Sequence, residues 1–474
     1  MMPVLLSPGR ERPSPRGANE APRITSKEEF GTMITRRASV TALAAVAVAG
    51  LASGCLSSNT GGGSSGGGTA SGPGKGTVEV MYGFGQEQEV AFQKDLNKFA
   101  QANGFTVKFT KAASWDTEIR ARVAGGNPPD VGLFPQPGVM CDLAKQKKVL
   151  AWDDADVTTA TADMVSGFKG AGTCTDGKVY GLPSAVSVKS LLWTDQANFT
   201  ATGDQLPTTL DGMLQLTDQL KSQGKVPWCI AAESGQATGW PITDWIEDLV
   251  LRLAGPDNYD KWVTGALKFN SPEIKPAFEY FQKIAFTDAN VRGGTKSIVA
   301  TNFQTGGNAL FDKPPGCYLF KQATFIAGKG GFPDAVLASL DTTVGVTAFP
   351  PKTAGDNPVL SGGDLAAAFN NDSNTLKLRN FIASKDNGVE AGKAGYFSPH
   401  KSFDVTLYPS KTLQKIASDV LYKASAVRFD GSDLMPAKVG AGTFWTEPVK
   451  WINGQQDLDT TLNNIDNSFP KASS

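Results

Sequence analysis

The sequence predicts an α/β protein with a parallel sheet covered by helices. From Thr77 onward, short stretches in which apolar and polar residues alternate are separated by stretches with apolar residues at helical spacing. A strand, a helix and a second strand in succession require a right-handed crossover, which makes the two strands parallel. The region after Thr77 has roughly 400 residues, too many for a single core, so we expect it to divide into lobes.

The individual elements follow from this periodicity. We expect strands over 78–82, 105–109 and 130–134, joined by helices over 92–103 and 114–124. Further helices are expected over 210–220, 243–253, 276–284, 445–452 and 458–465. Ligands of parallel sheets bind beyond the carboxyl ends of the strands, so the first candidates for a binding cleft are residues 83–87, 111–115 and 134–136.

Charge and composition exclude several classes of protein. The chain has 45 Lys and Arg against 46 Asp and Glu, so it lacks the positive excess of a nucleic-acid binder. Its residues are 40% apolar and 9% aromatic, which is enough to fill real cores. The single histidine, His400, provides little for a metal site or a catalytic triad, and we expect it at the surface. We therefore expect no cofactor, no bound metal and no catalytic residue.

The first 76 residues carry features of export and tethering. Arg36 and Arg37 precede an uncharged apolar run over 40–53, which is too short to span a bilayer and is typical of a signal peptide. The small residues that end at Cys55 resemble a bacterial lipobox, although Ala52 stands where a leucine is usual. A plain signal peptide with an incidental cysteine is the alternative. The expected parts are an upstream extension with a lipoprotein signal peptide over 1–54, and a lipidated cysteine with a flexible Gly/Ser-rich tether over 55–76.

Several short blocks beyond the tether form an ordered set. They are Gly125–Asp130, Leu133–Gly138, Tyr180–Pro183 with Leu191–Trp193, Gly239–Trp245, Pro315–Cys317, Ser361–Asp364 and Gly442–Trp445. This set resembles the extracellular sugar-binding lipoproteins of ABC importers, in the α-glucoside-binding branch, and more distantly maltose-binding protein. The blocks are spread over nearly all of 77–474 and occur in the order of that family.

The resemblance implies a two-lobed, periplasmic-binding-protein-like fold of type II, with a ligand cleft between lobes joined by a hinge that the chain crosses three times. The crossings would lie near Ser187–Val188, Phe349–Pro350 and Ser398–Pro399. Lobe one would comprise 77–187 plus 350–398, and lobe two 188–349 plus 399–474. The hinge would close on a carbohydrate, an α-glucoside or another oligosaccharide, and the closed form would dock on a membrane permease near the tether. A monomer is expected.

A cleft for a sugar needs aromatic rings against the apolar C–H faces and planar polar groups around the hydroxyl rim. Trp445 stands at a helix start, where the family places a stacking aromatic residue. Trp240 lies in a Gly-Trp-Pro turn, and Phe134 ends the third expected strand. Core packing is the alternative for each of these rings.

Polar candidates occupy similar positions. Asp364 follows Gly363, and a glycine lets the backbone approach a ligand closely, although a helix-cap role is the alternative. Gln136 lies between two prolines, which would mount its amide rigidly. Glu87 opens the first helix, where the helix dipole alone also favours a carboxylate. The remaining ligand-binding candidates are Glu233, Asp244 and Lys321.

Four cysteines follow Cys55. An even number in an exported protein indicates two disulfides, with three possible pairings. The lobe boundaries implied by the resemblance place Cys141 and Cys174 in lobe one and Cys229 and Cys317 in lobe two. A bridge between lobes would lock the hinge, so we expect each pair to form within its lobe. Free buried thiols are the alternative.

Two other functions stay open. A secreted carbohydrate hydrolase would need two carboxylates about 5–9.5 Å apart, and acidic residues are abundant in this chain. A binding protein for a non-sugar solute, such as a polyamine or an anion, is the second alternative. The ordered blocks and the tether favour a transport binding protein, and the tryptophans at the candidate positions favour a sugar.

Overall fold

A computed structural model describes residues 74–470 of the chain, in which ten strands form two sheets. The six-stranded sheet contains β1 (Thr77–Tyr82), β2 (Thr106–Lys111), β3 (Val131–Phe134), β4 (Leu182–Val188), β9 (Pro358–Ala368) and β10 (Ala426–Phe429). The four-stranded sheet contains β5 (Leu191–Asp195), β6 (Trp228–Cys229), β7 (Leu319–Lys321) and β8 (Val344–Ala348). The expected signal peptide, Cys55 and most of the tether lie outside the described residues.

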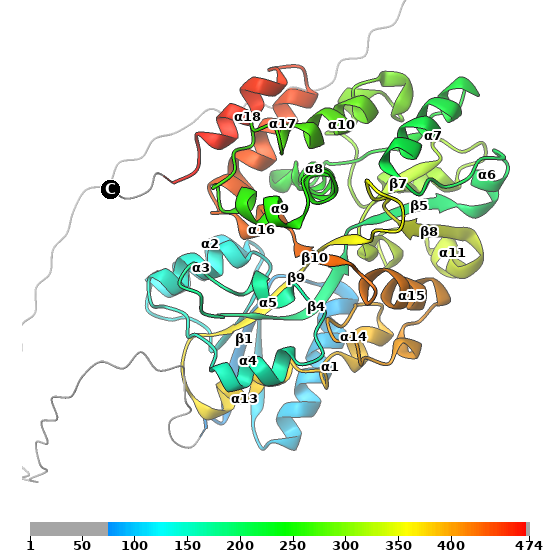
Figure 1. Cartoon of the computed structure of the whole chain (residues 1–474). Helices are drawn as coiled ribbons and strands as arrows, with labels where there is room; N and C mark the ends of the chain where they lie inside the picture. The colour runs from blue at the N-terminus through cyan, green and yellow to red at the C-terminus, as the bar shows by residue number, and fades with distance from the viewer. Residues whose placement is uncertain (1–73, 471–474) are drawn as a thin grey trace, which may run out of the picture. The chain divides into compact units, whose positions relative to one another are not determined.

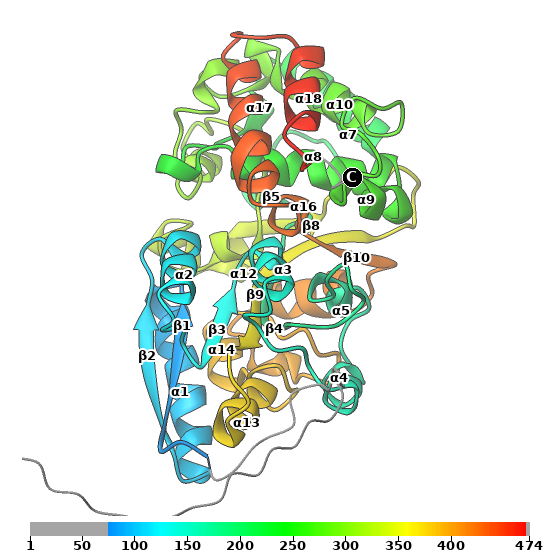
Figure 2. The same cartoon turned by 90° about the vertical axis from the view of Figure 1, so that its left-hand side faces the viewer.

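The helices complete the α/β architecture that the sequence predicts. They are α1 (Gln86–Ala102), α2 (Trp115–Ala124), α3 (Pro137–Lys145), α4 (Asp154–Thr161), α5 (Phe168–Ala171), α6 (Gln196–Thr200), α7 (Leu210–Ser222), α8 (Trp240–Leu253), α9 (Pro256–Val263), α10 (Lys275–Ala285), α11 (Asp334–Leu337), α12 (Leu340–Thr343), α13 (Ser373–Ile382), α14 (Val389–Lys393), α15 (Lys411–Lys415), α16 (Gly431–Leu434), α17 (Phe444–Ile452) and α18 (Leu458–Asp466). Helices α1 and α13 lie beside the six-stranded sheet, whereas α7, α8, α10, α17 and α18 lie on the side of the four-stranded sheet (Figures 1 and 2).

The first three strands confirm the predicted parallel arrangement. Strand β1 pairs in parallel with β2 from Thr77 to Tyr82, and with β3 at Val80 and Met81. The inward residues of these strands share a core cluster with apolar residues of α1 and α13. Leu96 of α1 is fully buried there, as its place in the helical repeat predicts.

The rest of the six-stranded sheet is mixed rather than parallel. Strand β9 runs antiparallel to β3 and to β4, and β10 runs parallel to β9. Strand β9 follows the return of the chain from the four-stranded sheet. It therefore enters the six-stranded sheet at the end where β3 leaves it, and the two strands run in opposite directions. Every described helix is too short or too polar to cross a lipid bilayer.

The chain passes between the two sheets at three places. The first is Lys189–Ser190, between β4 and β5, and the second is Phe349–Asn357, between β8 and β9. The third differs from the expected crossing at Ser398–Pro399. Strand β10 pairs with β9 from Pro358 to Ser361, which keeps the chain beside the six-stranded sheet up to Phe429. We therefore place the third passage at Asp430, and the division into lobes stays a prediction with this changed boundary.

Both disulfides form in the predicted pairing. Cys141 of α3 is bonded to Cys174, and Cys229 of β6 is bonded to Cys317. The second bridge is buried, whereas both cysteines of the first are partly exposed. Neither bridge joins a residue of the six-stranded sheet to a residue of the four-stranded sheet, so neither restrains the three passages.

Candidate functional site

A cavity of about 580 Å³ lies between strand ends of the six-stranded sheet and the start of α8. Its lining includes Gln88 in the first turn of α1, Lys111 at the end of β2 and Pro135 just after β3. These residues follow the carboxyl ends of three parallel strands, where the sequence predicts a ligand cavity. The volume falls within the roughly 300–1,000 Å³ of small-molecule sites. We call this cavity the cleft.

Asp364 projects from the middle of β9 into the cleft. Its position depends on an irregularity in β4, where the pairing shifts register between Pro183 and Val186. Gly363 makes room for this bulge, because a Cβ atom there would lie 2.3 Å from the carbonyl oxygen of Ala185. Bulges of this kind turn side chains toward binding sites. The glycine before Asp364 therefore serves the backbone packing that presents the carboxyl group.

The carboxyl group of Asp364 makes no hydrogen bond or ion pair with another residue of 74–470. Burial raises its pKa from the usual 3.8 to about 7. The side chain is half-buried in the cleft, and a partly desolvated carboxyl group without a protein partner costs free energy. This carboxyl group is therefore available to a ligand that donates hydrogen bonds.

Three aromatic rings line the wall of the cleft near α8. They belong to Trp240, Phe303 and Phe325, which we call the aromatic cluster. The Trp240 ring centroid lies 4.9 Å from that of Phe303 and 6.0 Å from that of Phe325. The Trp240 indole nitrogen donates to Ser234 Oγ at 3.1 Å, which fixes the ring orientation. All three rings are only partly buried, so their free faces suit the apolar face of a ring-shaped ligand.

A second carboxyl group, Asp433 of α16, reaches the cleft from the other side of the third passage. Burial and the neighbouring Asp430 carboxylate raise the pKa of Asp433 well above its usual value. Lys189 also lines the cleft, and its ammonium group lies 5.4 Å from the Trp240 ring centroid. The cleft thus combines two acidic groups, one ammonium group and the aromatic cluster.

Three buried carboxylates below the cleft come close enough to hold a metal ion. Asp244, Glu247 and Asp430 have carboxylate oxygens within 4.8 Å of one another. The Lys189 ammonium nitrogen, however, lies 2.8 Å from Asp244 Oδ1 and 2.5 Å from Asp430 Oδ2. A lysine in this position supplies the positive charge that a cation would supply. We interpret the group as a buried ion-pair network, in which burial raises the pKa of Asp244 to about 7.

Of the ten predicted ligand-binding residues, Trp240, Gly363 and Asp364 line the cleft. Glu87 lines an adjoining cavity of about 350 Å³, which shares Phe325 and Tyr396 with the cleft. These four are the candidates that the structure brings together.

The other candidates lie elsewhere in the described conformation. Phe134 is fully buried against Trp115 and Phe369. Gln136 precedes α3 and lines no described cavity. The Trp445 ring is half-buried, with its indole nitrogen 3.4 Å from Ser432 Oγ.

Three polar candidates have structural partners. The Glu233 carboxylate accepts from Gly235 N at 2.8 Å and from Asn302 Nδ2 at 3.0 Å, so it holds a turn. Lys321 is buried, and its ammonium nitrogen lies 3.2 Å from Asp248 Oδ2. Asp244 pairs with Lys189 as described above. All three groups already have hydrogen-bond or ion-pair partners within the protein.

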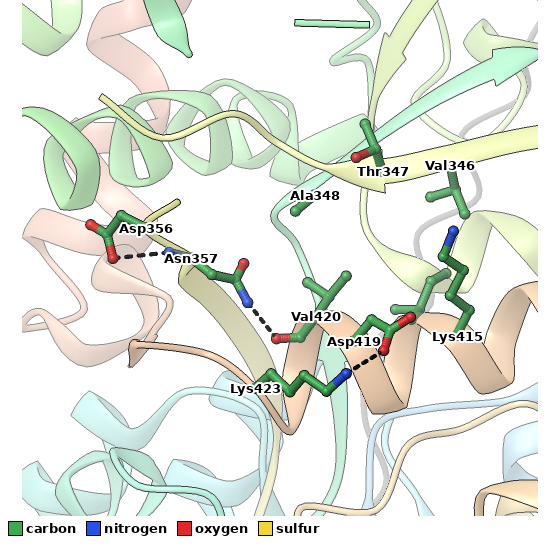
Figure 3. Close-up of a pocket in the computed structure, with 10 residues that line it drawn as sticks. Val346, Thr347, Ala348, Asp356, Asn357, Lys415, Asp419, Val420 and Lys423 are labelled. Atoms are coloured by element: carbon green, nitrogen blue, oxygen red, sulfur yellow. Dashed lines mark hydrogen bonds and ion pairs between the residues drawn. The ribbon is translucent and has the colours of Figure 1, made fainter. Parts of the chain in front are cut away.

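Another cavity, of about 380 Å³, lies between β8 and the segment 415–423 (Figure 3). Its polar groups mostly bond one another. Asp419 pairs with Lys423 at 2.8 Å, and Asn357 Nδ2 donates to the carbonyl oxygen of Val420 at 3.0 Å. Figure 3 shows both contacts as dashed lines among the residues that line the cavity. The cavity offers a ligand fewer free polar groups than the cleft does.

The expectation of a surface position for His400 is wrong. The ring is 2% exposed, with Nδ1 at 2.6 Å from Asp163 Oδ1 and Nε2 at 3.1 Å from the carbonyl oxygen of Ala383. These contacts join its segment to the ends of α4 and α13. The residue has a packing role that its sequence context of Ser-Pro-His-Lys did not indicate.

The family model for bacterial extracellular solute-binding proteins matches residues 85–389. This match spans more than half of the chain and includes most of the cleft lining. The chain belongs to this family.

Two relatives cover most of this solute-binding protein. The osmoprotective compounds-binding protein GgtB of Synechocystis sp. is 36% identical over 390 residues, which is 81% of this chain and 90% of the relative. The alpha-glucosides-binding periplasmic protein AglE of Rhizobium meliloti is 34% identical over 381 residues, covering 79% and 82% of the two chains.

Solved structures share the fold of this solute-binding protein. The bacterial solute receptor AcbH matches with a TM-score of 0.67 at 16% identity, covering 83% of this chain and 96% of that chain. A chitin oligosaccharide binding protein matches with a TM-score of 0.65 at 18% identity, covering 82% and 97%. At these identities the likeness concerns the fold alone.

Several cleft residues of this solute-binding protein were not predicted from sequence. They are Gln88, Lys189, Phe303, Phe325, Tyr396 and Asp433. Lys111, which also lines the cleft, belongs to residues 111–115, which were expected there because they follow a parallel strand. The two phenylalanines stand in loops and short turns without a periodic pattern. An aromatic residue flanked by polar residues, as Phe303 is by Asn302 and Gln304, was the available signal.

Proposed function

We propose that this solute-binding protein captures a neutral carbohydrate, an α-glucoside or another oligosaccharide, outside the cell. The observation that carries the proposal is the Asp364 carboxyl group, which has no protein partner and shares the cleft with the aromatic cluster. A saccharide offers hydroxyl donors to Asp364 and apolar ring faces to Trp240, Phe303 and Phe325. The names of the two relatives, which bind alpha-glucosides and osmoprotective compounds, support small polyhydroxylated ligands.

We further propose that the loaded protein delivers its ligand to the permease of an ABC importer. Family membership supports this role, because a solute-binding protein acts by presenting its ligand to a membrane partner. Closure about the three passages would bring Asp364 and Asp433, which lie on opposite sides of the third passage, onto the same ligand. A lipid on Cys55 and the tether would hold the protein near the permease. The protein would act as a monomer.

A thermal-shift screen tests the choice of ligand. The panel should contain maltose, trehalose, synthetic α-glucosides, polyol osmolytes, a polyamine and an anionic sugar. A ligand at 100 times its dissociation constant stabilises the native state by about 2.7 kcal/mol, which a melting curve resolves. Stabilisation by neutral saccharides supports the proposal, whereas stabilisation by the polyamine or the anionic sugar alone would contradict it.

The two acidic groups of the cleft also define a test for a hydrolase. Asp364 and Asp433 both have raised pKa values, and glycosidases use such a carboxyl pair. The saccharide that binds should therefore be incubated with excess protein and analysed by chromatography. Recovery of intact saccharide supports a binding protein, and release of its component sugars would establish a hydrolase instead.

A further inference from the structure

Helix α8 carries four buried charged residues on one face. Glu247 and Asp248 follow Asp244 by three and four residues, and Arg252 follows Asp248 by four, so the four residues lie on neighbouring turns. None of the four is more than 5% exposed. Burying charged groups is costly unless each has a partner, so the partners show what the face does.

The first passage between the sheets is held by two of these residues. Ser190 Oγ donates to Asp248 Oδ1 at 2.7 Å, and Lys189 Nζ donates to Asp244 Oδ1 at 2.8 Å. Ser190 Oγ also accepts from the backbone nitrogen of Leu360 at 2.7 Å, which connects the first passage to β9.

The second passage is held by Arg252. Its Nη2 atom donates to the carbonyl oxygen of Phe349 at 2.8 Å and to that of Pro358 at 3.0 Å, and its Nε atom donates to that of Pro350 at 3.0 Å. Arg252 also pairs with Asp248 on its own helix. One guanidinium group therefore donates hydrogen bonds to backbone carbonyl groups at both ends of the second passage.

The third passage is held by Glu247. Its carboxylate oxygens accept from the backbone nitrogens of Gly431 at 3.1 Å and Ser432 at 3.0 Å. Asp430, in the same passage, pairs with Lys189 of the first passage. One helix face thus contacts all three passages, and Lys189 extends the network to the cleft wall beside Trp240.

We propose that this face of α8 is a hinge clasp, in which Asp244, Glu247, Asp248 and Arg252 are positioning residues that hold the three passages in one geometry. None of these four residues lines the cleft. It limits the relative orientations of the two sheets, so that fewer conformations must be given up when the cleft closes. Loss of a clasp residue then weakens ligand binding because the competent geometry is less populated. The binding readout of this inference rests on the proposed function.

Glu247→Gln tests the clasp, because glutamine keeps the shape of the side chain but replaces one of its two acceptor oxygens with an amide nitrogen. That nitrogen cannot accept a hydrogen bond from the backbone N–H group of Gly431 or Ser432. Asp466→Asn is the matched control. Asp466 accepts from the backbone nitrogens of Phe269 at 2.8 Å and Asn270 at 3.1 Å, far along the chain from the passages. Two quantities should be measured for each variant: the dissociation constant for the best saccharide of the panel, and amide hydrogen exchange in the unliganded protein.

We expect Glu247→Gln to weaken binding by about tenfold, within the usual range of coupling between sites. It should also speed exchange in peptides covering 187–192 and 349–361, which Glu247 does not contact. Asp466→Asn should lower stability while leaving affinity and exchange at these peptides unchanged. Unchanged affinity of Glu247→Gln, with faster exchange only over 430–433, would overturn the clasp.

A second variant and a second readout cover the cases in which Glu247→Gln does not fold or no saccharide binds. If Glu247→Gln does not fold, Ser190→Ala replaces it, because this change removes only the hydroxyl group that links Asp248 to Leu360. If the unmodified protein binds no saccharide, the proposed function fails, and the exchange of the first two passages alone decides the clasp.

Discussion

Asp364 lowers the stability of the unliganded protein. Its carboxyl group is held in the cleft without a protein partner, and burial raises its pKa from 3.8 to about 7. Such a group is retained at functional sites although it opposes stability. The folded protein binds this proton more tightly than the unfolded chain does, so the free energy of unfolding falls as pH rises from about 4 to 7.

We predict that Asp364→Asn removes this pH dependence. The variant should melt at a higher temperature than the unmodified protein at pH 8, and this difference should be smaller at pH 5. Saccharide binding at pH 8 should weaken by about 10- to 100-fold, because hydrogen bonds to a charged group contribute about 1.5–3 kcal/mol. Melting curves and calorimetric titrations at both pH values check the prediction, which an unchanged affinity would contradict.

The aromatic cluster leads to a second prediction at this scale. Trp240→Ala should weaken saccharide binding by about 2 kcal/mol, or roughly 30-fold, because it removes an exposed ring face from the cleft. Trp240→Phe should retain most of the affinity. Trp445→Ala is the matched comparison, since the Trp445 ring is half-buried outside the described cleft lining.

Calorimetric titration and urea melts separate these variants. We expect Trp445→Ala to lower stability more than affinity. A larger loss of affinity in Trp445→Ala than in Trp240→Ala would show that the structure ranks these rings wrongly and that the family resemblance ranks them correctly.

Individual site residues were only partly predictable from the sequence. Asp364 and Trp240 stood next to glycines in recognisable turns or strands, which marked them as accessible. Phe134 was chosen because it ends an expected strand, yet its ring is covered by Phe369, which directly follows β9, the antiparallel partner of β3. Asp433 reaches the cleft only because β10 pairs with β9 some 70 residues earlier in the chain, a long-range contact that no local pattern encodes.

Elements with strong periodicity were predicted well, and short elements were not. The first three strands and the amphipathic helices α7, α10 and α18 lie within a few residues of their expected bounds. Helix α8 begins at Trp240, three residues before its expected start, because Pro241 fits the first turn of a helix. Strand β10 has only four residues, so its alternation is too short to mark a strand, and the third crossing was expected earlier, near Ser398–Pro399.

The disulfides give a prediction at the scale of elements. Replacing Cys141 and Cys174 with alanine should lower stability by about 4 kcal/mol on the chain-entropy model, since the bridge closes a loop with a sequence separation of 33. Saccharide affinity should stay the same, because neither cysteine lines the cleft. Urea melts and calorimetric titration of the double variant measure both quantities. A weakened affinity would show that α3 contributes to the cleft geometry.

At the scale of the whole molecule, the expected attachment site lies outside the residues that form the cleft. The cleft lining runs from Gly85 to Asp433, and the family match begins at Gly85. The expected lipid attachment at Cys55 and the tether precede all of these residues.

We therefore predict that Cys55→Ser releases the protein from the membrane and leaves its ligand affinity unchanged. The serine hydroxyl group cannot take the thiol-linked lipid, whereas the cleft keeps every residue that the proposal uses. Detergent partition of the two proteins measures the anchor, and calorimetric titration of the released protein measures affinity. Uptake of the saccharide by cells should fall, because the tether no longer raises the effective concentration of the binding protein at the permease. A Cys55→Ser protein that still partitions into the detergent phase would show that the anchor lies elsewhere in the chain.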